Sequence, residues 1–131
     1  MVILNSSEDQ GMFYVETKNL DGETNLKLKT VSDELIEHFE DDSVYSKLAG
    51  IINMEGPNNR IYKFDGNFDI THLLNQSDNS GGPLNISGEH SKKSNIIPLS
   101  NDNVALRGMS LRNTEVVTGV VVYTGHDSKI Q

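Results

Sequence analysis

Hydrophobic and polar residues alternate near the start of the chain in a pattern that predicts short β-strands. The run Met1–Leu4 is apolar throughout and is typical of the tail of a strand. Gly11–Lys18 alternates and carries Phe, Tyr and Val, which favour strands. Asn19–Thr24 then has the composition of a turn, because Asn, Asp and Gly tolerate unusual backbone angles. In Leu26–Lys29 leucine alternates with lysine, which predicts another short strand with one face in water.

The spacing of apolar residues then becomes helical. Ser32 has the side chain of an N-cap for a helix from Asp33 to about Glu40. Its apolar face is supplied by Leu35, Ile36 and Phe39. The other side of this helix is acidic, and we interpret it as a solvated face, with a docking patch for a partner as the alternative.

Two strands are predicted in the middle of the chain, Gly50–Glu55 and Arg60–Phe64, joined by a turn at Gly56–Asn59. From Asp65 to Asn95 the chain is rich in Asn, Ser, Gly and Asp, and we expect a polar, mobile insertion at about 65–95. Within it, Ile70–Leu74 has the apolar content to pack as a short helical turn.

The pattern of an ordered domain returns at Ile96. Three further strands are predicted, at Val104–Arg107, Met109–Arg112 and Val116–Thr124. The last is rich in valine, so we expect it to be central in its sheet. Six or seven short strands with one or two helices indicate a compact, mainly β domain.

The composition narrows the classes of function. At 131 residues the chain is expected to form one domain over residues 1–131. Its net charge of -8 argues against a nucleic-acid surface and against direct docking on anionic lipid. The absence of cysteine excludes disulfides and thiolate chemistry. No signal peptide is visible, and the most apolar stretch, Val116–Tyr123, is too short to span a bilayer, so we expect a soluble piece.

The sequence carries no complete catalytic apparatus. It has no phosphate-binding P-loop, no Gly-x-Gly-x-x-Gly and no Gly-x-Ser-x-Gly. Its four histidines share no metal-ligand spacing, so we expect neither a metal nor a cofactor on this chain. One candidate remains, the carboxylate of Glu23, which follows a predicted strand on the loop Asp21–Thr24. Such a loop presents one carboxylate outward, although Asp-Gly alone is a common turn.

Three blocks of sequence give this loop a context. They read YVETKNLDGETNLKLK (14–29), GIINMEGPNNRIYKFDG (50–66) and PLSNDNVALRGMSLRNTEVVTGVVVYTGHDSKI (98–130). In this order they resemble the actuator domain of the type-IV P-type ATPases, the phospholipid flippases. The chain departs from that pattern at Gly56, Glu115 and Ser128, none of which touches the loop. The resemblance implies a distorted β-sandwich or jelly-roll-like fold.

The resemblance also implies roles for the loop residues. In P-type pumps an aspartate on another domain is phosphorylated by ATP, and an actuator glutamate positions the water that removes the phosphate. Glu23 matches that glutamate. Gly22 would let the backbone approach a phosphate without a side-chain clash. Asp21 and Thr24 would hold the loop or contact the phosphate, with plain turn formation as the alternative.

The resemblance implies a setting as well. Both ends of the chain look cut, so we expect one part of a multi-pass membrane pump, on the cytosolic face, inactive by itself. Its partners would be the phosphorylation and nucleotide-binding domains and the membrane helices of the same protein, with an accessory subunit possible in such pumps. ATP, Mg²⁺ and the phospholipid would bind those other parts.

Two other interpretations stay open. One is the actuator domain of a cation-transporting ATPase, which the loop disfavours because those pumps typically read Thr-Gly-Glu-Ser. The other is a non-catalytic, β-rich binding module that uses the acidic helix or the polar insertion. Burial of Glu23 in internal salt bridges would favour the binding module, and exposure at the tip of a loop would favour an actuator.

Overall fold

The computed structural model describes residues 1–38, 50–70 and 96–128. These residues form eight strands, two short α-helices and three 3₁₀ turns. The strands are β1 (Val2–Ser6), β2 (Met12–Glu16), β3 (Lys27–Thr30), β4 (Ile51–Met54), β5 (Gly66–Asp69), β6 (Ile96–Leu99), β7 (Ser110–Arg112) and β8 (Val117–Val120). The helical elements are η1 (Asp9–Gly11), α1 (Lys18–Asp21), α2 (Asp33–His38), η3 (Asn101–Asn103) and η4 (Gly125–Asp127). The prediction of a compact, mainly β domain with one or two short helices is confirmed.

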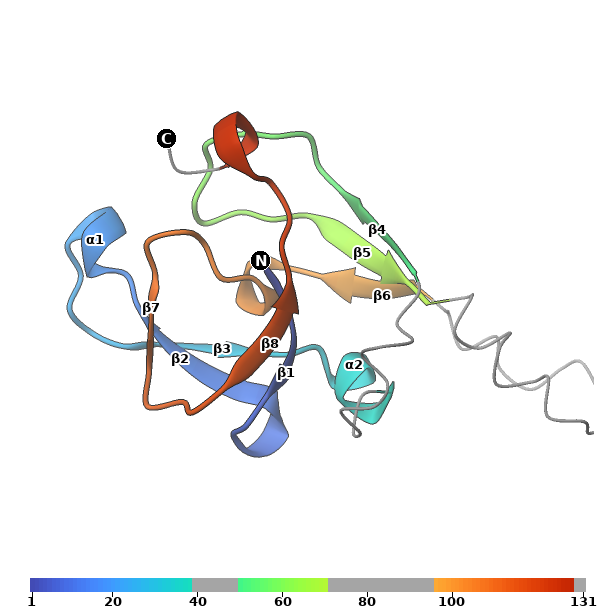
Figure 1. Ribbon diagram of the computed structural model, residues 1–131, viewed down its shortest axis with the longest axis horizontal. Helices are drawn as coiled ribbons and strands as arrows, with labels where there is room; N and C mark the ends of the chain where they lie inside the picture. Colours follow the sequence, from blue (N-terminus) through green and yellow to red (C-terminus); the bar gives the residue numbers. More distant parts are fainter. Residues whose placement is uncertain (39–49, 71–95, 129–131) are drawn as a thin grey trace, which may run out of the picture.

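The strands form three small antiparallel sheets, ordered β1-β8, β3-β2-β7 and β4-β5-β6 (Figure 1). An isolated bridge between Val2 and Val104 ties the segment after β6 to β1. The apolar start of the chain therefore does form a strand, as predicted, and this strand lies between distant parts of the sequence. Its side chains Val2, Ile3 and Leu4 are all nearly inaccessible to water.

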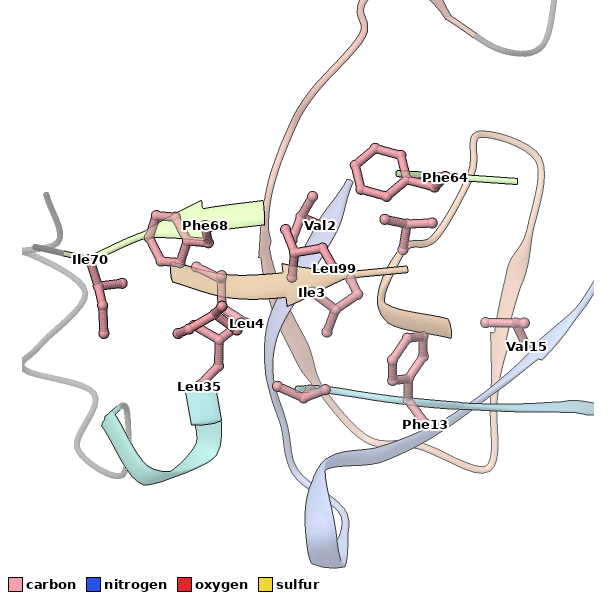
Figure 2. Close-up of a cluster of buried hydrophobic side chains, with 13 residues drawn as sticks. Val2, Ile3, Leu4, Phe13, Val15, Leu35, Phe64, Phe68, Ile70 and Leu99 are labelled. Atoms are coloured by element: carbon pink, nitrogen blue, oxygen red, sulfur yellow. The ribbon is translucent and has the colours of Figure 1, made fainter. Parts of the chain in front are cut away.

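All three sheets and α2 contribute to one hydrophobic core (Figure 2). Phe13 and Val15 point inward from β2, as expected from their alternation with Tyr14. Leu35 packs into the core from α2, as its helical spacing predicts. Phe68 enters from β5. Burial of such side chains stabilises the fold by about 1.5–3 kcal/mol each.

Strand β3 forms where predicted but with the opposite face buried. Lys29 is 5% exposed, whereas Leu28 is 51% exposed. The register explains the inversion, because Lys29 pairs with the buried Phe13 and Leu28 pairs with Tyr14. The ammonium group of Lys29 is satisfied there by two backbone carbonyls, Asn101 O at 2.7 Å and Val104 O at 2.9 Å. Burial lowers the pKa of Lys29 from 10.5 to about 8.

The strand predicted at Arg60–Phe64 is wrong. That segment is irregular, and the strand that pairs with β4 comes later, at Gly66–Asp69. The Asn58 side chain accepts from Arg60 N at 3.0 Å and donates to Gly56 O at 3.0 Å, and such local bonds compete with a strand ladder. Two alternate side chains of this segment make separate contacts instead, Tyr62 with Asp21 and Phe64 with the core.

The expected start of the polar insertion is also wrong. Gly66–Asp69 is the central strand of its sheet, and Phe68 and Ile70 are core residues. Single large apolar residues among polar neighbours are enough to build a half-buried strand. The rest of the insertion, the possible helical turn beyond Ile70, and the end of the acidic helix lie outside the described residues.

Three further features differ from the prediction. Residues 104–107 make no strand beyond the bridge at Val104. Among the described strands β8 pairs with β1 alone and is not central, so its valines reflect the general preference of valine for strands and not a central position. The segment Asn19–Thr24, expected as a turn, begins inside the one-turn helix α1.

None of the helices in the described part of the chain is long and apolar enough to cross a membrane.

The buried lysine generates a prediction about stability and pH. Between pH 8 and pH 10 the unfolded chain keeps Lys29 protonated while the folded chain releases that proton, so folding is favoured as pH rises. The free energy of unfolding of the wild type should rise relative to Lys29→Met by up to about 1.4 kcal/mol per pH unit.

Urea unfolding of both chains from pH 7.5 to pH 10 measures this difference. Lys63→Met, which alters an exposed lysine, is the control and should run parallel to the wild type. A difference between wild type and Lys29→Met that stays constant with pH would show that the Lys29 pKa is not depressed.

Candidate functional site

The candidate loop leaves the end of β2 and projects from one end of the molecule with α1 (Figure 1). Thr17 precedes the helix and is 1% exposed, so the base of the loop is fixed in the core. The helix ends after one turn because Gly22 takes the left-handed conformation, with φ of 77°. Gly22 N donates to Lys18 O at 2.9 Å and closes that turn. The chain thus reverses just before Glu23.

The carboxylate of Asp21 organises this loop. The Thr17 hydroxyl donates to its two oxygens at 2.9 and 3.1 Å, and the Glu23 backbone N–H donates to Oδ1 at 2.9 Å. The Tyr62 hydroxyl is a third donor, and Lys27 Nζ, 3.3 Å from Oδ2, is a fourth. The side chain is 14% exposed. These hydrogen bonds, that of Tyr62 foremost, lower the pKa of Asp21 well below its usual range.

Tyr62 reaches this loop from a distant part of the sequence. It lies 41 residues along the chain from Asp21, in the connection between β4 and β5, which runs toward α1 in Figure 1. Its ring centroid lies 5.1 Å from Lys27 Nζ, which is the geometry of a cation–π contact. The hydrogen bond to Asp21 raises the pKa of Tyr62. One side chain therefore contacts both a carboxylate and a cation of the loop.

Lys27 completes the cluster. Its Nζ lies 2.9 Å from Glu23 Oε2 and 3.3 Å from Asp21 Oδ2. Hydrogen bonding to Glu23 and to Asp21 raises the pKa of Lys27, so it is cationic at neutral pH.

The four predicted site residues share one loop but differ in environment. Asp21 is engaged by internal hydrogen bonds. Glu23 is 58% exposed, and its carboxylate pairs with Lys27 at the surface and not in the interior. Thr24 is exposed, with no hydrogen-bond partner among the described residues. Gly22 has open space around the position of a missing Cβ, so a docking group can approach its backbone closely.

Three residues of the cluster were not predicted from the sequence: Thr17, Lys27 and Tyr62. Thr17 and Lys27 lie within six residues of Asp21, and a search for polar side chains flanking the loop would have found them. No local signal connects Tyr62 to the loop, because their contact depends on how two sheets pack.

Two arginines lie apart from this cluster. Arg112 pairs with Glu16, with Nε 3.5 Å from Oε2. Arg107 lies at a mostly apolar hollow of about 480 Å³ lined also by Phe64, Val104 and Tyr123. No loop residue from 17 to 27 lines that hollow, so it is not part of the candidate site. Among the described residues, no group of His, Asp or Glu has the arrangement to hold a metal ion.

The chemistry available to this cluster is limited. It offers one exposed carboxylate, one hydroxyl and one cation on a backbone reversal, without a nucleophile activated by a neighbouring base. An exposed carboxylate on a fixed loop can accept a proton from water and orient it. The reacting group would have to come from outside this cluster.

Comparison with known proteins gives consistent matches over nearly the whole chain. Phospholipid-transporting ATPase C887.12 of Schizosaccharomyces pombe is 41% identical over 133 residues, which is 99% of this chain and 9% of that protein. Phospholipid-transporting ATPase 6 of Arabidopsis thaliana is 38% identical over 130 residues, with the same coverage of each. Phospholipid-transporting ATPase DRS2 of Saccharomyces cerevisiae is 38% identical over 129 residues, 98% of this chain and 8% of that protein. No family model matches the chain.

The conformation of Gly22 generates a second prediction. Gly22→Ala should lower the free energy of unfolding by about 1 kcal/mol, because a Cβ is disfavoured at φ of 77° although nothing blocks it sterically. Gly56→Ala is the matched control, since that glycine also has open space around it but no positive φ. It should leave stability unchanged or slightly raised. Urea unfolding measures both, and equal effects would contradict the role of the backbone conformation.

The Tyr62 hydroxyl generates a third prediction. Tyr62→Phe keeps the ring beside Lys27 but removes the hydrogen bond that lowers the pKa of Asp21 most, so that pKa should rise toward its ordinary value. Carboxyl carbon NMR titration of the chain measures that pKa. Tyr14→Phe, on β2, should leave it unchanged, because Tyr14 makes none of the hydrogen bonds that lower the pKa of Asp21. An Asp21 titration that is identical in wild type and Tyr62→Phe would refute the contact.

Proposed function

This chain is a homologue of one segment of the phospholipid-transporting ATPases, and we propose that it is the actuator domain of such a pump. Its loop Asp21–Thr24 would remove the phosphate from an aspartyl phosphate on a separate domain and so couple ATP hydrolysis to lipid movement. The chain spans 8–9% of the length of these relatives, so most of such a pump, with the phosphorylated domain, the nucleotide site and the membrane helices, would lie outside it.

The observation that carries this proposal is the exposure of Glu23 beside a fixed Asp21. The Glu23 side chain is 58% exposed, while its backbone N–H is held by a carboxylate that is 14% exposed. A reacting carboxylate must be accessible to its partner and still be held in a defined place. The loop meets both requirements, and the binding-module alternative explains neither.

The reaction can be written from the groups on this loop. A water molecule attacks the phosphorus of the aspartyl phosphate, and the bond from phosphorus to the aspartate oxygen breaks. Glu23 accepts the proton of that water and holds the water in line with the leaving carboxylate. The products are inorganic phosphate and a free aspartate. General-base assistance of this kind contributes about 10²–10⁴-fold to the rate.

The other loop residues would support that step. Gly22, with open space on its outer side, lets the partner's phosphate approach the backbone. Thr24 has a hydroxyl without an internal partner in the described structure, and it would donate to the phosphate or to the partner domain. Asp21 would not react, because its oxygens are engaged by Thr17, Tyr62 and Lys27.

The proposal assigns the remaining components to the rest of the pump. ATP and Mg²⁺ would bind the nucleotide-binding and phosphorylation domains, and the phospholipid would contact the membrane helices. The domain would act at the cytosolic face and would hydrolyse no ATP by itself. A cation-transporting pump is the weaker candidate, since the relatives reported above are named as phospholipid-transporting.

Replacement of the carboxylate tests this function. In the full-length pump, Glu23→Gln should slow phosphoenzyme decay by about 10²–10⁴-fold, because the amide cannot accept the proton. Phosphoenzyme formation should be unchanged. A pulse of labelled ATP followed by a chase measures both rates, and hydroxylamine sensitivity identifies the acyl phosphate. Glu37→Gln, which alters an exposed glutamate on α2, is the control and should decay like the wild type.

Either of two results would count against the function. Normal decay in Glu23→Gln would remove the assignment of the general base. The absence of an acyl phosphate in the wild type would rule out a pump and favour the interpretation as a binding module.

A further inference from the structure

The ammonium group of Lys27 has bonding capacity that the loop does not use. A lysine carries three N–H donors. Two of them have acceptors, Glu23 Oε2 at 2.9 Å and Asp21 Oδ2 at 3.3 Å. No third acceptor lies within hydrogen-bond distance among the described residues. The side chain is 32% exposed, so this donor is accessible at the same surface as the Glu23 carboxylate.

The position of Lys27 is fixed more firmly than that of an ordinary surface lysine. Asp21, one of its two partners, is itself held by Thr17 and Tyr62. The Tyr62 ring covers the ammonium at 5.1 Å. The second partner, Glu23, is the more exposed of the two carboxylates. The contact of Lys27 with Asp21 is therefore fixed, whereas its contact with Glu23 can be exchanged for another partner.

From this geometry we propose that Lys27 is a further catalytic residue, which binds an oxygen of the partner domain's phosphoryl group when the loop docks. The inference rests on the proposed function and adds a residue to it. The unused N–H of Lys27 first donates to a phosphoryl oxygen, and competition from this anion then opens the pair between Lys27 and Glu23. The released Glu23 carboxylate then turns to the attacking water, while Asp21 keeps the ammonium in place.

Charge makes such a group necessary at this loop. Asp21 and Glu23 contribute two negative charges and Lys27 one positive charge, which leaves the cluster at -1. Without Lys27 it would stand at -2 and would repel an incoming phosphoryl group more strongly. A single cation beside the general base thus lets a carboxylate approach an anion, and it stabilises the charge of the transferring group.

An ordinary surface ion pair is the alternative, and such pairs contribute little. The full-length pump distinguishes the two with a set of variants. Lys27→Met removes the charge and keeps an unbranched side chain, and Lys27→Arg keeps the charge. Lys18→Met is the matched control, because Lys18 is an exposed lysine of the same loop whose side chain has no partner in the described structure.

Phosphoenzyme decay and inhibition by orthovanadate, a mimic of the transferring phosphoryl group, are the two measurements. Lys27→Met should decay about 10-fold more slowly than the wild type and need about 10-fold more vanadate, as expected for the loss of a charge-assisted hydrogen bond. Lys27→Arg should recover most of both effects. Lys18→Met should match the wild type in both.

Wild-type decay and vanadate sensitivity in Lys27→Met would overturn the proposal. Equal defects in Lys27→Met and Lys27→Arg would overturn it too, because they would show that side-chain fit and not charge is what matters. Glu23→Gln in the same series separates this failure from that of the proposed function. If Glu23→Gln stalls while Lys27→Met behaves normally, the function stands and the role of Lys27 falls.

Discussion

The carboxylate of Asp21 and the hydroxyl of Tyr62 make the contact on which the candidate site depends. It joins the loop after β2 to the connection between β4 and β5, which belong to different sheets. Asp21 in turn holds Thr17, the Glu23 backbone and Lys27. Because a one-turn helix is unstable alone, α1 needs such contacts to keep its place. Glu23 thus has a defined position although its side chain is 58% exposed.

The hydrophobic core fixes the base of the loop and leaves its tip exposed. Phe13 and Val15 anchor β2, and Thr17 continues this buried alternation to the last residue before α1. Beyond Thr17 no residue as far as Leu28 is buried. The loop therefore projects from a rigid strand, which suits the proposed docking on a separate domain.

Lys29 shows how backbone hydrogen bonding can override a hydrophobic pattern. By alternation its leucine neighbours should face the core, yet the lysine is buried and Leu28 is exposed. The two carbonyls at 2.7 and 2.9 Å belong to η3 and the residue that follows it, so the buried ammonium joins β3 to a distant segment. A leucine there would leave both carbonyls without this donor, and a buried unsatisfied acceptor costs about 1–3 kcal/mol.

Local chemistry in the sequence by itself determined the mainly β class, most strands, the start of α2 and the loop that carries Glu23. Alternation, β-propensity and turn composition act between near neighbours and can be read directly. Only the tertiary structure decided the buried face of β3, the partner of β8 and the engagement of Asp21 by Tyr62. Each of these depends on contacts between segments far apart in the chain, whose energies no local pattern contains.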